Sequence, residues 1–212
     1  MGMQVIATNI SGPTTVLWKG KQITTGIFKH PVQESLELGM ENVEGDTVFD
    51  RKVHGGIYKA CYLFSTDQYP FWQKKYPDLK WQWGMFGENL SVQGLDERKL
   101  RIGSIYRLGS ALVQISHPRE PCFKLGIRFE DPKIIREFID HGYPGTYVRV
   151  MEPGSVTRGD MMELVEESGN PLTTHQFFQW LFAKEKDREV LRLALENEGL
   201  SPSKREGLKK WA

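Results

Sequence analysis

Residues 105–126 have the sequence IYRLGSALVQISHPREPCFKLG, and this stretch decides the fold. Ile105–Leu108 and Ala111–Ile115 are short runs rich in the apolar residues that strands favour. Gly109 and Ser110 separate the two runs, and a two-residue turn that contains glycine is typical of a β-hairpin. The sequence therefore predicts an antiparallel hairpin that delivers the chain to Cys122.

Cys122 is the first candidate for chemistry. Prolines stand one and four residues before it, and each fixes its own φ and pushes the preceding residue toward extended backbone. Arg119, Lys124 and His117 are close enough in sequence to favour the thiolate, which is the form that binds metals and attacks electrophiles. A cysteine beside a proline turn is also common as a small buried apolar side chain, so the residues alone leave both interpretations open.

Length and composition describe an ordinary globular protein. The chain has 212 residues with 39% hydrophobic and 26% charged residues, enough for one large domain or a domain with a small appendage. The formal net charge of +1 gives no nucleic-acid footprint, so we expect a small-molecule partner. The first residues lack a signal-peptide pattern, and no apolar run approaches the roughly 18 residues needed to cross a bilayer. These features predict a cytoplasmic protein without a membrane partner.

The rest of the chain predicts strands first and helices last. Residues 67–76 and 131–140 have helical patterns that begin at Asp67 and Asp131, and β-favouring runs cover most of the remainder up to residue 165. Those runs are 4–7, 14–18, 22–28, 60–64, 90–92, 146–150 and 161–165. A linker-like composition near residue 168 then precedes three short amphipathic helices, the first with a capping box at 173–176. We therefore expect two domains, 1–168 and 169–212.

Two further segments are weaker candidates for a site. Lys52 and His54 precede Gly55 and Gly56, and paired glycines after cations allow the backbone to approach an anion such as phosphate. The alternative is a glycine turn that leads into the strand at 60–64. Residues 88 and 89 offer an acceptor and a donor before the strand at 90–92, although glutamate and asparagine there also suit a simple turn.

Taken in order, several segments resemble the MOSC domain proteins, and most closely the stand-alone bacterial YiiM group. The order of the motifs, with GENL before PREPC and a helical tail, is more specific than any one of them. The segments are Lys29–Val32, Lys52–Gly56, Phe86–Leu90, Ile102–Ser104, Ser116–Leu125 and Glu152–Val156.

The resemblance implies a mostly β fold, namely an antiparallel MOSC-type β-barrel with peripheral helices and a small C-terminal three-helix region. It implies an oxidoreductase that carries molybdenum cofactor (molybdopterin) and reduces N-hydroxylated compounds such as hydroxylaminopurines, a detoxifying N–O bond reduction at a Cys-ligated molybdenum. An electron-donating reductase would be its partner, and the group also allows a homodimer or pyridoxal phosphate binding. A non-catalytic carrier of the cofactor or its sulfur is the alternative.

The resemblance also implies roles for individual residues. Cys122 would be the catalytic residue and the molybdenum ligand. The other expected contacts, to the pterin, its phosphate or the substrate, are Lys52, His54, Gly55, Gly56, Glu88, Asn89, Arg119 and Lys124. A metal-free cysteine hydrolase that pairs Cys122 with His117 or His54 is a rival hypothesis. A nucleic-acid-binding barrel is a second rival, against which the near-neutral charge argues.

Overall fold

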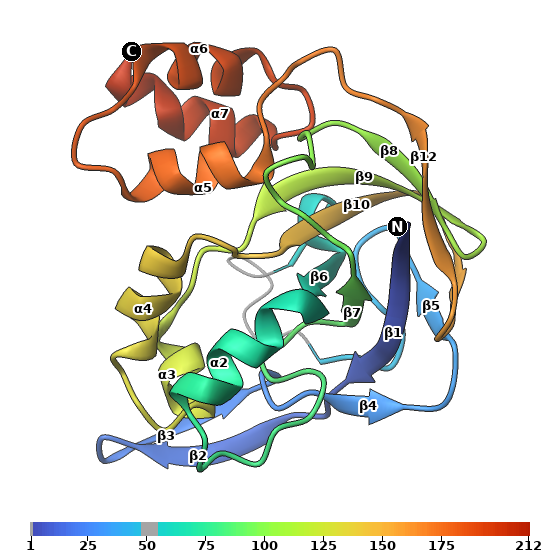
Figure 1. The fold of residues 1–212 in the computed structure, drawn as a ribbon, viewed down its shortest axis with the longest axis vertical. Helices are drawn as coiled ribbons and strands as arrows, with labels where there is room; N and C mark the ends of the chain where they lie inside the picture. The colour runs from blue at the N-terminus through green and yellow to red at the C-terminus, as the bar shows by residue number, and fades with distance from the viewer. Residues whose placement is uncertain (1, 48–54) are drawn as a thin grey trace.

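The computed structural model describes residues 2–47 and 55–212, and its centre is a closed seven-stranded β-barrel (Figure 1). The strands follow the order β12-β8-β9-β10-β6-β7-β1, and β1 closes the ring by pairing with β12. Their bounds are β1 (Met3–Ile10), β6 (Cys61–Ser65), β7 (Leu90–Gln93), β8 (Ile105–Leu108), β9 (Ala111–Pro118), β10 (Thr146–Glu152) and β12 (Met161–Glu166). The predicted hairpin is confirmed, because β8 and β9 pair antiparallel from Leu108↔Ala111.

The barrel is mostly antiparallel, as expected, but one pair of neighbouring strands is parallel, so the barrel is mixed. β6 and β7 run parallel, with Leu63 opposite Leu90. Parallel neighbours need a connection long enough to return the chain to the same end of the sheet. Here that connection is residues 66–89, which include the helix α2 (Tyr69–Lys75).

Among the described residues, five short strands lie outside the ring. β2 (Thr14–Trp18) and β3 (Lys21–Thr25) form a separate hairpin, which Figure 1 shows apart from the barrel beside the helix α3 (Phe123–Arg128). The tight turn between them was predicted, but β1 pairs with β4 (His30–Val32) and not with β2. β5 (Leu36–Leu38) pairs with β11 (Gly154–Val156).

Helix caps differ from the predicted ones at two places. Asp67 lies in the 3₁₀ turn η2 (Thr66–Gln68) before α2, and its Oδ2 accepts a hydrogen bond from Gly94 N at 3.0 Å. The helix α4 (Ile134–His141) begins after Asp131, whose Oδ1 accepts from Lys133 N. Asp131 therefore stabilises the turn that precedes its helix, whereas Asp67 connects η2 to Gly94, the residue after β7. Helix α3, which follows Cys122 directly, was not predicted, because six residues are too few to show a helical period.

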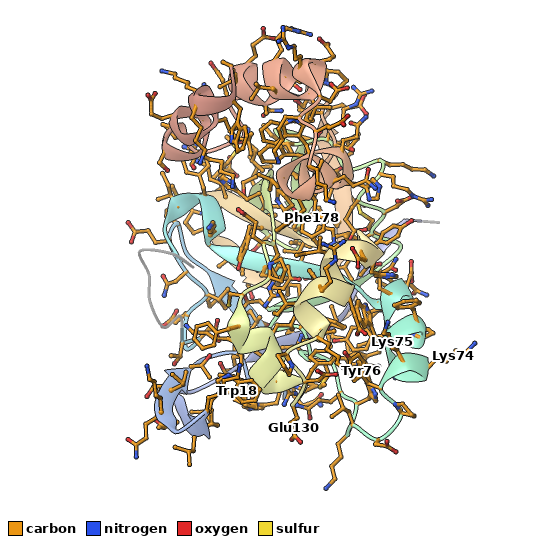
Figure 2. The ribbon with its side chains drawn as sticks, turned by 90° about the vertical axis from the view of Figure 1, so that its left-hand side faces the viewer. Trp18, Lys74, Lys75, Tyr76, Glu130 and Phe178 are labelled. Atoms are coloured by element: carbon orange, nitrogen blue, oxygen red, sulfur yellow. The ribbon has the colours of Figure 1, made fainter. Side chains whose placement is uncertain are left out.

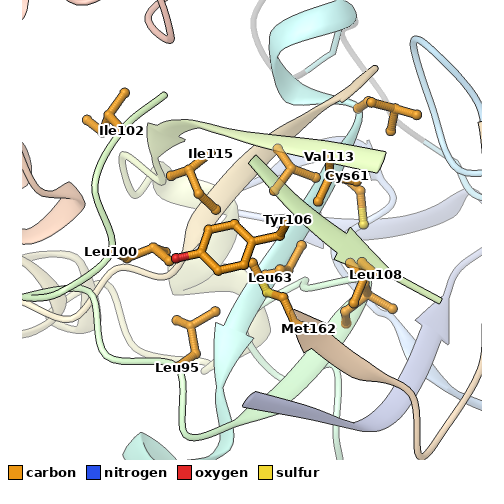
Figure 3. Close-up of a cluster of buried hydrophobic side chains, with 14 of the residues drawn as sticks. Cys61, Leu63, Leu95, Leu100, Ile102, Tyr106, Leu108, Val113, Ile115 and Met162 are labelled. Atoms are coloured by element: carbon orange, nitrogen blue, oxygen red, sulfur yellow. The ribbon is translucent and has the colours of Figure 1, made fainter. Parts of the chain in front are cut away.

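Two apolar cores hold these elements. The barrel interior is filled by aliphatic side chains around Tyr106, as Figure 3 shows for Leu63, Val113 and Ile115. An aromatic cluster lies between the barrel and helices α2, α3 and α4. Its fully buried members include Phe64, Trp72, Phe86, Phe129 and Phe138. Among the described residues no helix has both the length and the apolar character needed to span a membrane.

The C-terminal helices rest on the barrel. They are α5 (Thr174–Phe182), α6 (Arg188–Glu196) and α7 (Pro202–Leu208), followed by the turn η3 (Lys209–Trp211). The predicted capping box of α5 is present, since Thr173 and Gln176 exchange both hydrogen bonds. Phe178 of α5 packs edge-on against Phe138 of α4 with ring centroids 6.3 Å apart (Figure 2). Asn197 Nδ2 donates to Ile102 O at 3.1 Å. The division of the chain at residue 168 stays a prediction.

Glu97, in the loop before β8, makes stability depend on pH. It is fully buried, and burial raises its pKa to about 7 although Gly145 N donates to its Oε1 at 2.9 Å. The folded state therefore keeps this proton when the unfolded chain, with an ordinary glutamate pKa, has lost it. We expect the stability that Glu97 contributes to be complete below about pH 4 and lost as pH rises through about 7, a fall of about 1–3 kcal/mol. Urea unfolding of wild type and of Glu97→Gln between pH 5 and 8 gives the free energy of unfolding of each protein, and the difference is the contribution of Glu97. If the free energy of unfolding changed equally with pH in both proteins, this prediction would be wrong.

Candidate functional site

Cys122 stands at the edge of a pocket. It is a free, half-buried thiol in extended backbone, with φ −127° and ψ 170°, immediately before α3. The pocket has an empty volume of about 640 Å³, with the solvent at its mouth included, and its lining comes from the barrel, the base of the β2–β3 hairpin and the Cys122 loop. Cys122 therefore lines a pocket that is open to solvent.

A buried cation lines the same pocket. Arg119 is 6% exposed, and its guanidinium carbon lies 5.4 Å from the ring centre of Tyr62 and 5.6 Å from that of Phe138. Aromatic faces stabilise a guanidinium, but they do not satisfy its donors. Its Nη1 is buried and has no hydrogen-bond partner among the described residues. An unsatisfied buried donor is costly, so this atom suits an acceptor supplied by a ligand.

A buried ion pair forms another part of the wall. Lys29 Nζ donates to both carboxylate oxygens of Asp46, and the two side chains are 6% and 2% exposed. Asp46 also accepts from Ser11 N at 3.0 Å and from Asn89 Nδ2 at 2.9 Å. Asn89 Oδ1 in turn accepts from Tyr62 N at 3.2 Å. This network fixes Asn89, a predicted site residue, in the pocket lining.

Glu88, the residue before Asn89, lies behind the lining. It is 0% exposed and accepts hydrogen bonds from Gly84 N at 2.9 Å, Phe86 N at 3.1 Å and Ser91 Oγ at 2.8 Å, and from the hydroxyl of Tyr69. Its oxygens are therefore used within the protein. Glu88 therefore stabilises the Gly84–Phe86 loop through these hydrogen bonds. This geometry does not support the expected direct contact between Glu88 and a ligand.

A second pocket adjoins the first and shares Lys59 and Glu120 with it. Its empty volume is about 860 Å³, open solvent included, and it lies between residues 55–59, the end of β9 and the start of α7. Gly55 and Gly56 line this second pocket and not the one that contains Cys122. The two glycines that were expected to contact an anion thus lie next to the cysteine pocket, and that contact stays a prediction.

The structure separates the predicted site residues into three groups. Cys122, Asn89, Arg119 and Lys124 line one pocket. Gly55 and Gly56 line its neighbour, and Glu88 is buried behind both. Lys52 and His54 lie outside the described residues, so their predicted roles stay predictions.

His117 does not support the thiolate in the way the sequence suggested. Burial lowers its pKa to about 3, so the ring is neutral near pH 7, and its Nε2 accepts a hydrogen bond from Ser201 N at 3.2 Å. It lines the second pocket and not the one with Cys122. This arrangement also argues against the hydrolase hypothesis in its His117 form, because the nitrogen that would act as base is occupied.

Several pocket residues were missed by sequence analysis as site residues. They are Lys29, Asp46, Lys59, Tyr62 and Tyr147. Lys29 falls inside a segment that carried the family resemblance, which was the available signal. The tyrosines lie in strands where an aromatic residue is ordinary, and burial raises the pKa of both phenols so that they remain neutral.

The MOSC domain family model matches residues 50–163, which includes Cys122 and the strands that surround it. The chain belongs to the MOSC domain family. One relative and one solved structure agree. YflK of Bacillus subtilis is 40% identical over 161 residues, covering 76% of this chain and 72% of YflK. YiiM of Geobacillus stearothermophilus has a crystal structure that matches with a TM-score of 0.82 at 28% identity, over 98% of each chain.

A second relative carries an enzyme's name. A Gibberella moniliformis protein named Reductase is 34% identical over 151 residues, which is 69% of this chain and 27% of that protein. The chain therefore corresponds to about a quarter of the length of that relative. Membership of the MOSC family and this relative are both compatible with enzymatic activity in the chain described here.

Proposed function

We propose that this chain is a molybdenum-cofactor-dependent reductase of N-hydroxylated compounds. The observation that carries the proposal is the half-buried Cys122 thiol in one pocket with the unsatisfied Arg119. A soft thiolate suits molybdenum that is also bound by pterin sulfurs, and a guanidinium suits a phosphate or a pterin edge. The residues present therefore fit the cofactor that the family name implies.

Each pocket residue would have a separate role in binding the cofactor. Cys122 would supply the thiolate ligand, and Arg119 and Lys124 would hold the anionic parts of the cofactor. Asn89, whose amide is bonded to Asp46 and to Tyr62 N, would form part of the wall beside the pterin. When bound, the cofactor supplies two-electron redox chemistry. The overall change is R–NH–OH plus two electrons and two protons to R–NH₂ plus water, with the electrons drawn from a partner reductase.

A non-catalytic carrier of the cofactor would use the same cysteine. The second pocket next to Cys122 favours the enzyme, because a carrier needs no separate space for a substrate.

The test is metal analysis joined to an activity assay. Full-length protein, expressed in cells that make the cofactor, is expected to contain about one molybdenum per chain and to reduce hydroxylaminopurine with a chemical or enzymatic electron donor. Protein from cells unable to make the cofactor is the control and is expected to be inactive. Molybdenum without turnover would support the carrier, and turnover without molybdenum would overturn the proposal.

A further inference from the structure

Tyr147 carries a further assignment, which rests on the proposed function. We infer that the Tyr147 hydroxyl binds the oxygen of the substrate's N–OH group, so that this residue distinguishes the N-hydroxylated substrate from its amine product. Tyr147 lies on β10 and lines the same pocket as Cys122. Its strand pairs with the end of β9, from which the chain continues into the Cys122 loop. A ligand in this pocket therefore meets both the phenol and the thiol.

The ring of Tyr147 is held in place by its neighbours. It pairs in register with Tyr62 of β6, and the two ring centres are 5.1 Å apart with an angle of 37° between the ring planes. The backbone oxygen of Tyr147 also accepts a hydrogen bond from Ser116 Oγ at 3.0 Å. A hydroxyl on a fixed ring is a preorganised donor, because little side-chain freedom is lost when it binds a ligand.

The two tyrosines differ in what their hydroxyls bind. The Tyr62 hydroxyl donates to Pro144 O at 2.8 Å, so its hydrogen is already used. The Tyr147 hydroxyl lies within hydrogen-bond reach of the Arg119 guanidinium. A guanidinium only donates, so the phenol oxygen is the acceptor in that contact and the phenol hydrogen stays available to a ligand. Of the two, Tyr147 is therefore the one that can donate into the pocket.

Two cations strengthen this donor. Arg119 acts on the phenol oxygen, and Lys59 Nζ lies 5.7 Å from the centre of the Tyr147 ring. Both cations draw electron density away from the O–H bond, and a hydrogen bond donated by a polarised group is stronger. Burial nevertheless raises the pKa of Tyr147, against the opposing effect of Arg119, so the phenol keeps its hydrogen at pH 7.

The hydroxylamine oxygen suits a neutral donor of this kind. It is an uncharged hydroxyl oxygen with lone pairs, whereas the anionic groups of the cofactor are matched by the charged donors of Arg119 and Lys124. In the overall reduction the N–O bond breaks, two electrons from the partner reductase are taken up, and two protons convert the fragments to amine and water. The amine has no oxygen for Tyr147 to bind, so the product should be bound less tightly than the substrate.

The test compares Tyr147→Phe with wild type in full-length, molybdenum-loaded protein. Tyr76→Phe is the matched control, because its hydroxyl donates to Glu137 Oε2 and Tyr76 lines neither pocket. Calorimetric titration without an electron donor gives the Kd of hydroxylaminopurine and of adenine, its amine product. We expect wild type and Tyr76→Phe to bind hydroxylaminopurine at least about 5-fold more tightly than adenine, the effect of one net hydrogen bond. Tyr147→Phe should bind both about equally, and its kcat/KM should fall by about 10-fold.

The affinity ratio separates this inference from the proposed function. A ratio near 1 in wild type, or a ratio that Tyr147→Phe leaves unchanged, overturns the role of Tyr147. Loss of molybdenum from Tyr147→Phe overturns it too, because Tyr147 would then hold the cofactor and not the substrate. If wild type turns over no N-hydroxylated compound, the proposed function falls, and the affinity ratio alone then decides whether Tyr147 recognises the N–OH oxygen.

Discussion

Replacement of Cys122 by serine is expected to lower molybdenum-dependent turnover by more than about 100-fold while leaving the fold intact. Loss of an outer-shell partner of a metal site alone costs about 10–100-fold, and this change removes the proposed ligand itself. The thiol is half-buried at the start of α3, and its Sγ makes no cap hydrogen bond that serine would disturb. Steady-state kinetics with hydroxylaminopurine and molybdenum content per chain are the measurements, and thermal unfolding confirms the fold.

Cys61 offers a matched control for this change. It is 1% exposed within the barrel core, and burial raises the pKa of its thiol, so it is a packing residue and not a reactive one. Cys61→Ala should retain turnover and molybdenum but lose about 1 kcal/mol of stability, the usual size of a small core deletion. Full turnover in Cys122→Ser with bound molybdenum would refute the ligand role.

Local sequence patterns predicted the strands well, because strand residues and tight turns have short-range signals. The β8–β9 hairpin and the capping box at Thr173 depend only on residues within a few positions of each other. The parallel pairing of β6 with β7 depends instead on the path of residues 66–89. The residue pattern within β6 and β7 does not indicate which strand will pair with which, or in which direction. The antiparallel barrel that the resemblance implied therefore did not include this parallel pair.

The difference between local and long-range contacts also explains which parts of the candidate site could be predicted from the sequence. Arg119, Cys122 and Lys124 lie within six consecutive residues, so the sequence alone brought them together. Asp46 and Asn89 are 43 residues apart, and only the barrel brings the carboxylate and the amide within 2.9 Å. For Glu88, the sequence suggested a ligand contact that the geometry does not support. A glutamate in a short motif has the composition of a binding residue, yet four donors inside the protein occupy its oxygens.

The second large effect concerns stability. Asp46→Ala is expected to lower the free energy of unfolding by about 3–5 kcal/mol, because it leaves the Lys29 ammonium buried without its carboxylate. The change also removes the acceptor for Ser11 N and Asn89 Nδ2, so the pocket wall should lose order together with stability. Urea unfolding of the cofactor-free chain at pH 7 measures the loss.

Two further variants make the origin of this loss measurable. Lys29→Met combined with Asp46→Ala removes both charges, and the double-mutant cycle should return a coupling of at least about 2 kcal/mol. Glu206→Ala breaks an exposed pair with Lys209 whose side chains are 70% and 64% exposed, and it should change stability by less than about 1 kcal/mol. If Asp46→Ala cost no more than Glu206→Ala, the Lys29–Asp46 pair would not be a stabilising element of the wall. The arrangement of Asn89 beside the Cys122 pocket would then need another cause, and its contacts with Tyr62 N and Asn9 O would be the remaining ones able to supply it.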